Sequence, residues 1–126
     1  MSDLFGNSIS LLSKALDCLW VRQEVISDNL SNVDTPGYKS KYVTFEDALR
    51  QCMQNGEKSR QELREDIQKS PCEIRETQGR VERLDGNNVD TTEEFVEMTR
   101  TTYQYQYLLN AVNQDISRLR SVIKGN

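Results

Sequence analysis

The sequence predicts an all-α protein in which two long terminal helices pair as an antiparallel, coiled-coil-like hairpin, with an extended or irregular middle segment between them. Two apolar stripes near the chain ends carry this prediction, because their steps alternate three and four residues. Large apolar side chains are also sparse between residues 57 and 83. We therefore divide the single 126-residue domain into an N-terminal helix and turn (1–36), a middle segment (37–89) that is extended, irregular or partly disordered, and a C-terminal helix (90–126).

The first helix is expected from about Asn7 to Asn32, over the whole length of the N-terminal stripe. Only Gln23 interrupts the apolar series. A narrow stripe of this kind is a seam that one helix offers to another. Its members are Ile9, Leu12, Leu16, Leu19, Ile26, Leu30 and Val33.

A hard turn is expected where this helix ends. Pro36 has no amide hydrogen and disfavours the helical conformation at Thr35. Gly37 follows, so the four residues from Thr35 to Tyr38 suit a type II turn, with proline second and glycine third.

The middle segment gives weaker signals. Residues Tyr38–Tyr42 are expected to be extended, and a short helix should begin with Thr44 as its N-cap and end at Asn55–Gly56. Residues Glu57–Lys69 favour helix by propensity but have no deep stripe, so a solvated helix and disorder both remain open. Residues Glu73–Arg83 alternate too weakly to predict a strand.

The last helix follows a turn cluster, Leu84–Asn88. Its N-terminus has two possible capping boxes, Thr91 with Glu94 or Asp90 with Glu93. The C-terminal stripe then runs for about four heptads, which favours a helix–helix seam. Its members are Phe95, Met98, Thr102, Tyr105, Leu109, Val112, Ile116, Leu119 and Ile123.

Two questions about contacts stay open at this point. The matching stripes could form the private core of a hairpin, or they could pack against neighbouring subunits. Tyr103 and Tyr107 lie four residues apart on a second face of the helix. They could pack partly against the middle segment or form a second interface, since tyrosine is favoured at contact surfaces.

The residue types argue against catalysis and cofactor binding. The chain has no histidine, which excludes a histidine base and a histidine-ligated zinc site. Cys18, Cys52 and Cys72 are odd in number and widely spaced, so we expect no disulfide framework and interpret each as a small buried or neutral residue. We expect no enzyme activity, no cofactor and no metal site.

Charge and hydropathy exclude further classes. The net charge is −4 and no basic run is present, which argues against nucleic-acid binding. No apolar run has the length needed to span a bilayer. The N-terminus lacks the basic and apolar regions of a secretory signal, so we expect a cytosolic protein or one exported without signal cleavage.

The stretch Ser27–Lys39 resembles the N-terminal signature of the bacterial flagellar rod, hook and hook-associated proteins, which is similar to A-x-N-[IL]-A-N-x-x-T-P-G-Y. Ser27 and Ser31 stand where alanine is more usual in that family. The resemblance covers the first fifty and the last forty residues. The matching signature residues are Asn29, Leu30, Asn32, Thr35, Pro36, Gly37 and Tyr38.

This resemblance implies a structural axial subunit of the basal-body rod, whose terminal helices pair, stack into a tubular polymer and transmit torque. It also implies export through the flagellar export apparatus without signal cleavage, a periplasmic destination, and other rod subunits as partners. Two alternatives remain: a sibling protein of the same rod, and a cytosolic coiled-coil adaptor or export chaperone.

Overall fold

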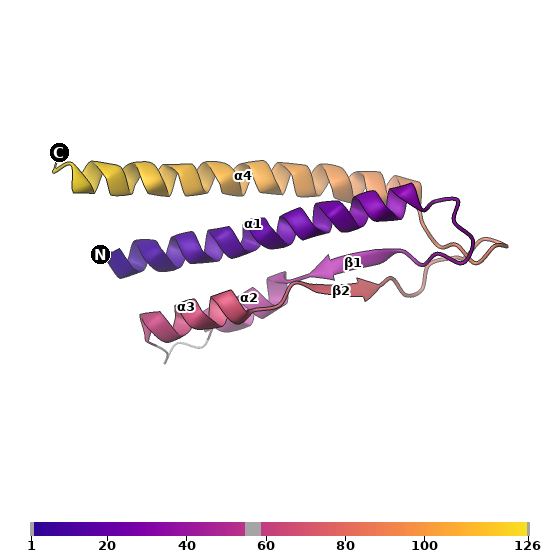
Figure 1. Ribbon diagram of the computed structural model, residues 1–126, viewed down its shortest axis with the longest axis horizontal. Coiled ribbons are helices and arrows are strands. Elements are labelled where there is room, and N and C mark those ends of the chain that lie inside the picture. Colours follow the sequence, from indigo (N-terminus) through magenta and orange to yellow (C-terminus); the bar gives the residue numbers. More distant parts are fainter. Residues whose placement is uncertain (1, 55–58, 126) are drawn as a thin grey trace.

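Helices make up most of the computed structural model, which describes residues 2–54 and 59–125 (Figure 1). The expectation of a mainly helical protein is therefore confirmed, although a small two-stranded sheet is also present. The elements in chain order are α1 (Ser2–Ser31), β1 (Lys41–Thr44), α2 (Glu46–Gln54), α3 (Arg60–Lys69), β2 (Glu73–Glu76) and α4 (Thr91–Ile123).

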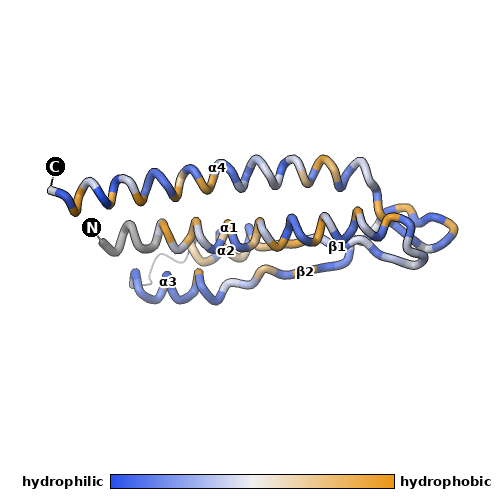
Figure 2. Tube along the Cα trace, turned by 45° about the horizontal axis from the view of Figure 1, so that its top comes forward, coloured by the Kyte–Doolittle hydropathy of each residue, from blue (hydrophilic) through white to orange (hydrophobic). Residues whose placement is uncertain are grey.

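Helix α1 lies between α4 on one side and the middle segment on the other. Figure 1 shows α1 and α4 side by side in opposite directions, and Figure 2 shows the same order after rotation. The start of α1 and the end of α4 therefore lie at one end of the molecule, and the loops that contain the signature turn lie at the other. Because α1 is covered on two sides, it buries two faces.

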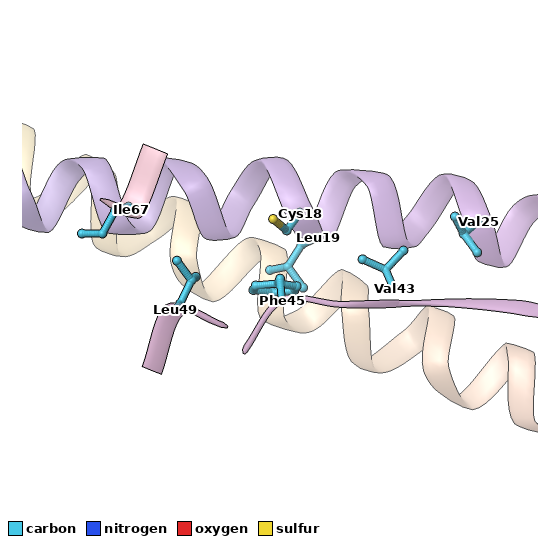
Figure 3. Close-up of a cluster of buried hydrophobic side chains, with 7 residues drawn as sticks. All are labelled: Cys18, Leu19, Val25, Val43, Phe45, Leu49 and Ile67. Atoms are coloured by element: carbon cyan, nitrogen blue, oxygen red, sulfur yellow. The ribbon is translucent and has the colours of Figure 1, made fainter. Parts of the chain in front are cut away.

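The hydrophobic core sits between α1 and the middle segment. Figure 3 shows side chains of α1, β1, α2 and α3 converging on it. Phe45, which immediately precedes α2, is 5% exposed, Leu49 of α2 is 7% exposed, and Ile67 of α3 is fully buried. The cluster consists of Cys18, Leu19, Val25, Val43, Phe45, Leu49 and Ile67. The middle segment is thus folded against α1 rather than only linking the two long helices.

The sheet contains a strand that the sequence did not predict. β1 and β2 pair antiparallel, with Lys41 opposite Glu76 and Thr44 opposite Glu73. All four residues of β2 are exposed, so it lacks the alternation of buried and exposed residues that reveals a strand in a sequence. Backbone pairing with β1 holds it in place instead.

The two short helices differ from expectation in detail. α2 begins at Glu46, and Thr44 is the last residue of β1, so Thr44 is not the N-cap. The expected end of this helix at Asn55–Gly56 lies outside the described residues. α3 is a helix from Arg60 to Lys69, and its N-cap Ser59 accepts a hydrogen bond from the Glu62 amide at 3.2 Å.

The cysteines differ from the expectation that the chain has no disulfide. Cys18 and Cys72 form a disulfide, with their Cα atoms 5.6 Å apart, so the expectation of no disulfide was wrong. The bond joins α1 to the segment between α3 and β2, two regions whose proximity depends on the tertiary fold and not on sequence spacing. Cys52 is a free, half-buried thiol.

Residues close in sequence determine where α1 ends and where α4 begins. α1 starts at Ser2, earlier than the expected Asn7, and stops at Ser31 before the proline turn. Asp90 is the N-cap of α4, and its side chain accepts hydrogen bonds from the amides of Thr92 and Glu93. Of the two predicted caps, the Asp90 register is therefore the one that forms.

Candidate functional site

The signature turn has the geometry that its proline and glycine predict. Gly37 has a φ of 74°, and the Tyr38 amide donates to the Thr35 carbonyl at 3.2 Å. A positive φ at the third position and this hydrogen bond define a type II turn. The Gly37 amide also donates to the Asp85 carbonyl at 2.7 Å, so the turn is bonded to the loop that precedes α4.

Asn29 is the centre of a buried hydrogen-bond network beside this turn. Its side chain has no solvent exposure. Nδ2 donates to the Lys41 carbonyl at 2.7 Å and to Glu94 Oε2 at 3.0 Å. Oδ1 accepts from the Lys41 amide at 3.0 Å and from the Tyr38 hydroxyl at 3.1 Å. All hydrogen-bonding positions of the amide are used, so Asn29 joins α1, the turn, β1 and α4 at one point.

Glu94 and Arg80 complete the network from the other side. Glu94 is 4% exposed, and its second oxygen accepts a hydrogen bond from Arg80 at 3.0 Å. Arg80 also donates to Ser40 Oγ at 3.1 Å and contacts Glu93 at 2.7 Å. Burial by itself lowers the pKa of Arg80, but the hydrogen bonds and charges of the two glutamates outweigh it and raise that pKa. The buried carboxylate is therefore paired, as its burial requires.

Tyr38 contributes a neutral hydroxyl to the same network. Burial raises the pKa of this phenol above 10.0, and the negative charges of Asp28 and Glu94 raise it further. The hydroxyl therefore keeps its proton and remains a hydrogen-bond donor to Asn29 across the neutral pH range.

Two adjacent asparagines bind the signature turn to the loop before α4. Asn87 is fully buried, and its Nδ2 donates to the carbonyls of Asn32 and Thr35 at 2.8 and 2.9 Å. Asn88 Oδ1 accepts from the Ser40 amide at 2.6 Å. The sequence predicts this stretch only as a turn cluster and does not reveal the partners of the signature, which are Asn87, Asn88, Ser40, Arg80 and Glu94. The one sequence signal was the pair of asparagines in the loop that leads into the last helix.

The other signature residues are half-buried or exposed, and the hydrogen bonds of their side chains are local. Leu30 and Asn32 are half-buried, while Thr35 and Pro36 are exposed. The Thr35 hydroxyl donates to Asn32 Oδ1 at 3.0 Å, and Asn32 Nδ2 donates to the Asp28 carbonyl at 2.8 Å. The network therefore uses Asn29, Gly37 and Tyr38 most directly.

The N-terminal stripe lies inside the molecule. Leu19 and Ile26 are buried, at 2% and 4% exposure. The remaining members are half-buried, and they are Ile9, Leu12, Leu16, Leu30 and Val33. Because α1 is covered on two sides, this stripe is largely used within the monomer.

The face of α4 that turns inward is only partly the predicted stripe. Buried or half-buried residues recur at alternating steps of four and three, and several of them are polar. Asp115 accepts a hydrogen bond from the Ser8 hydroxyl at 2.9 Å, for example. The inward residues are Glu94, Met98, Thr101, Tyr105, Leu108, Val112, Asp115 and Leu119. Four of them belong to the predicted C-terminal stripe: Met98, Tyr105, Val112 and Leu119.

The other half of the predicted stripe faces solvent. These residues recur every seven positions and form what we call the outer row: Phe95, Thr102, Leu109, Ile116 and Ile123. Phe95 is 58% exposed, Leu109 41%, and Ile123 76%. The orange segments that recur along α4 in Figure 2 show how apolar residues continue to the end of this helix. On a straight helix a row with seven-residue spacing drifts by about 20° per heptad, so a neighbouring helix follows such a row along its length when the two helices supercoil around each other.

Tyr103 and Tyr107 are also largely exposed. Their side chains are 69% and 75% exposed. They line a groove, together with Leu19 and Phe45, between α4, α1 and the residues that lead into α2. The structure thus presents two exposed apolar surfaces on α4, the outer row and this tyrosine pair.

Metal-binding clusters and membrane-spanning helices are absent from the part of the chain that the structure describes. No group of histidine, cysteine, aspartate or glutamate side chains there is arranged to hold a metal ion. No helix among the described residues is long and apolar enough to cross a membrane. The features that stand out are therefore the turn network and the exposed surfaces of α4.

Comparisons with known proteins agree on one family. The family profile described as "Flagella basal body rod protein" matches residues 12–39, the end of α1 and the signature turn. The chain is 31% identical to the flagellar basal body rod protein FlgB of Bacillus subtilis, over 97% of both chains. It is 29% identical to the protein of that name in Escherichia coli K12, over 99% of both, and 31% identical to that of Borrelia hermsii, over 97% of this chain and 99% of the relative.

Proposed function

The chain belongs to the FlgB family of flagellar basal body rod proteins, and on that premise we propose that it builds the proximal rod by packing the outer row of α4 against neighbouring subunits. It is a structural protein of the basal-body rod, and its partners include other rod components. We also propose that several copies of the chain assemble with one another and that the assembled rod transmits torque. The terminal helices of each copy would pack as a coiled coil and form one axial domain.

The outer row is the observation that carries this proposal. Leu109, Ile116 and Ile123 are exposed in the monomer and aligned along the helix, so a second helix could cover them all at once. Aligned apolar residues left in water are typical of protein–protein contact surfaces. Tyr103 and Tyr107 are exposed on a different face of α4 from the outer row. They support a second contact there, because tyrosine is enriched at interfaces.

The turn network supports the proposal by fixing the first turn of α4, where the outer row begins. Asn29, Glu94 and Asn87 hold the end of α1 to the beginning of α4 and to the loop before it. A fixed angle between the two long helices would present the outer row in one orientation. We further propose a periplasmic position in the rod and export through the flagellar export apparatus, without a cleaved signal.

The alternatives carry less support. A cytosolic adaptor or export chaperone would need no signature turn, and no comparison favours it. A sibling rod protein such as FlgC is also disfavoured, since the relatives that match nearly the whole chain carry the name FlgB.

The test is the variant Leu109→Asp, with Asn110→Asp as its control. Both add one negative charge to exposed neighbouring positions of α4, but only Leu109 belongs to the outer row. We expect Leu109→Asp to keep the circular dichroism spectrum and melting temperature of the parent but to be absent from purified basal bodies, with loss of swimming. Asn110→Asp should be incorporated. If Leu109→Asp were incorporated and supported swimming, the outer row would not be the assembly surface.

A further inference from the structure

The Cys18–Cys72 disulfide joins two segments that pack against each other in the core. Cys18 lies in the middle of α1, and Cys72 lies in the short link between α3 and β2. Cys18 is a fully buried member of the core cluster, and Cys72 packs against that cluster. Neither the turn network nor the outer row uses this bond. Its contribution is to the docking of the middle segment on α1.

The noncovalent contacts that hold α3 and β2 to α1 are modest in the described part of the chain. Ile67 is the buried residue of α3, and Leu63 is partly buried. Lys14 Nζ donates to the Gln68 carbonyl at 3.3 Å, but this position is exposed. A helix of ten residues is marginal in water without tertiary contacts. The docking of α3 and β2 on α1 should therefore weaken strongly when the disulfide is open.

Burial of Cys18 limits when the bond can form. Its side chain has no solvent exposure in the folded chain, while Cys72 is half-buried. Thiol–disulfide exchange needs direct attack of a thiolate on a sulfur atom, so an oxidising molecule has to approach the pair. The bond therefore forms while α3 and β2 are still displaced from α1. After docking, the sulfur of Cys18 is shielded from reducing agents in the same way.

The oxidation is an exchange with an external disulfide. The Cys72 thiolate attacks one sulfur of the oxidant, forms a mixed disulfide and releases the first oxidant thiol. The Cys18 thiolate then attacks the Cys72 sulfur and releases the second oxidant thiol. The two cysteines lose two electrons and two protons, which the oxidant takes up when its disulfide becomes two thiols. A protein disulfide or oxidised glutathione supplies this chemistry.

The compartment determines which form of the pair exists. Thiols of cytosolic proteins are kept reduced, whereas the bacterial periplasm favours disulfides. A chain that is made in the cytosol and built into a periplasmic rod passes from the first condition to the second. The covalent link between α1 and the middle segment is then absent at synthesis and present in the rod.

We propose that Cys18 and Cys72 form a redox switch, which is open while the chain is in the cytosol and closes when the chain meets a disulfide oxidant outside it. In the open form α3 and β2 are loosely held, so the chain unfolds more readily. In the closed form the same segments are fixed on α1, so the subunit in the rod resists unfolding. This inference rests on the export and the periplasmic position proposed above.

Thiol trapping in cells tests the switch. A flagellated strain is quenched with acid, separated into cytosol and purified basal bodies, and treated in denaturant with a maleimide–polyethylene glycol, which adds mass at each free thiol. The chain has three cysteines, so we expect three adducts in the cytosolic pool and one, at Cys52, in basal bodies. The variant Cys52→Ser should show two adducts and none.

The other outcomes of this experiment separate the two proposals. Three adducts on the parent chain in basal bodies, or a single adduct already in the cytosol, would overturn the switch. Adducts on the Cys52→Ser variant in basal bodies would also overturn it, because the pair would then be open in the rod. Absence of the parent chain from basal bodies would instead overturn the proposed function.

Limited proteolysis of the purified chain tests what the bond holds in place. Trypsin cleaves after Arg64 and Lys69 in α3 and after Arg100 in α4. When the chain is refolded with a reducing agent, we expect cleavage in α3 to become at least about tenfold faster, since loss of the bond raises the population of undocked α3. Cleavage after Arg100 should accelerate less, because α4 packs on the other side of α1 (Figure 1).

The matched control for proteolysis is the double variant Cys18→Ser with Cys72→Ser. It should be cleaved like the reduced parent chain, with or without the reducing agent. Equal cleavage of α3 in the oxidised and the reduced parent would overturn the proposal. Equal acceleration after Arg100 would overturn it as well, because the bond would then hold the whole monomer rather than the middle segment.

Discussion

The Asn29 side-chain amide donates to Glu94 Oε2 at 3.0 Å, and this hydrogen bond joins the end of α1 to the first turn of α4. The two residues are 65 positions apart in the chain and both are buried. Since Arg80 holds the other oxygen of the same carboxylate, one acidic group connects three segments. The signature asparagine therefore acts through a glutamate that lies far outside the signature.

Replacement of Glu94 by alanine should destabilise the monomer strongly. The variant Glu94→Ala leaves Arg80 and Asn29 without their buried partner, which we expect to cost about 3–5 kcal/mol in the free energy of unfolding. Glu93→Ala is the control, since the Glu93 side chain is 59% exposed and its removal should cost less than about 1 kcal/mol. Urea denaturation of the two variants measures the difference. Similar values for both would mean that the buried pair does not hold the helices together.

Glu46 should make stability depend on pH in acid. Burial alone would raise the pKa of this carboxyl, but hydrogen bonds from Arg22 and from backbone amides lower it below 4.5. The unfolded chain therefore binds more protons between the folded and unfolded pKa values, so stability rises with pH through that window. The contribution is complete above about pH 4.5 and is lost as pH falls through the folded pKa.

The variant Glu46→Gln isolates this contribution. Its unfolding free energy should decline less steeply than that of the parent when pH is lowered below 4.5. Arg22→Gln should reduce the slope in the same way, because Arg22 contacts Glu46 at 2.6 Å. Thermal melts between neutral and acidic pH provide the measurement. An unchanged slope in both variants would assign the acid sensitivity to other carboxylates.

Loss of the disulfide should lower stability through the unfolded state. Cys18 and Cys72 are separated by 54 residues, and closing a loop of this size contributes about 4 kcal/mol in the chain-entropy description. The double variant Cys18→Ser with Cys72→Ser should therefore melt at a lower temperature than the parent. A reducing agent should shift the parent but not the double variant, and Cys52→Ser should behave as the parent does. A parent melt that is insensitive to reduction would contradict this expectation.

Gly37 should resist substitution because of its backbone conformation alone. At a φ of 74°, an added Cβ would have no atom within 4 Å, so no clash contributes. We expect Gly37→Ala to destabilise by about 1–2 kcal/mol, since L-residues disfavour this region. Gly37→Asn should cost less, because asparagine tolerates it better. Chemical denaturation ranks the three proteins, and equal stability of the glycine and alanine forms would remove the turn as the reason for this glycine.

Much of the local structure follows from short-range chemistry and could be predicted. Pro36 and Gly37 determine their turn by φ restriction, and Asp90 caps α4 by a side-chain hydrogen bond to the residues that follow it. The strand β2 could not be predicted, because all its residues are exposed and its only reason to be extended is a partner strand. The Cys18–Cys72 bond was hidden for a similar reason, since no spacing rule joins those positions.

The inward face of α4 shows why a hydrophobic pattern can select the wrong half of a helix. Glu94 and Asp115 face inward although they are polar, because each accepts a hydrogen bond from a side chain of α1. Thr101 is polar as well and is buried at the same face. Leu109 and Ile116 face outward although they are apolar. A search for alternating apolar residues therefore combined part of the internal seam with the outer row. The pattern predicted the helix correctly, but it could not separate contacts within a subunit from exposed positions.

The disulfide also changes how a mechanical load passes through the covalent chain. A pull between the two ends runs along α1 to Cys18, crosses the sulfur atoms to Cys72 and continues toward α4. The residues between those cysteines, including the signature turn and β1, then carry no tension. At about 3.4 Å per residue over a separation of 54, the maximal extension of the chain is shorter by roughly 180 Å. A subunit of the basal-body rod would thus stretch as a shorter molecule than its length in residues suggests.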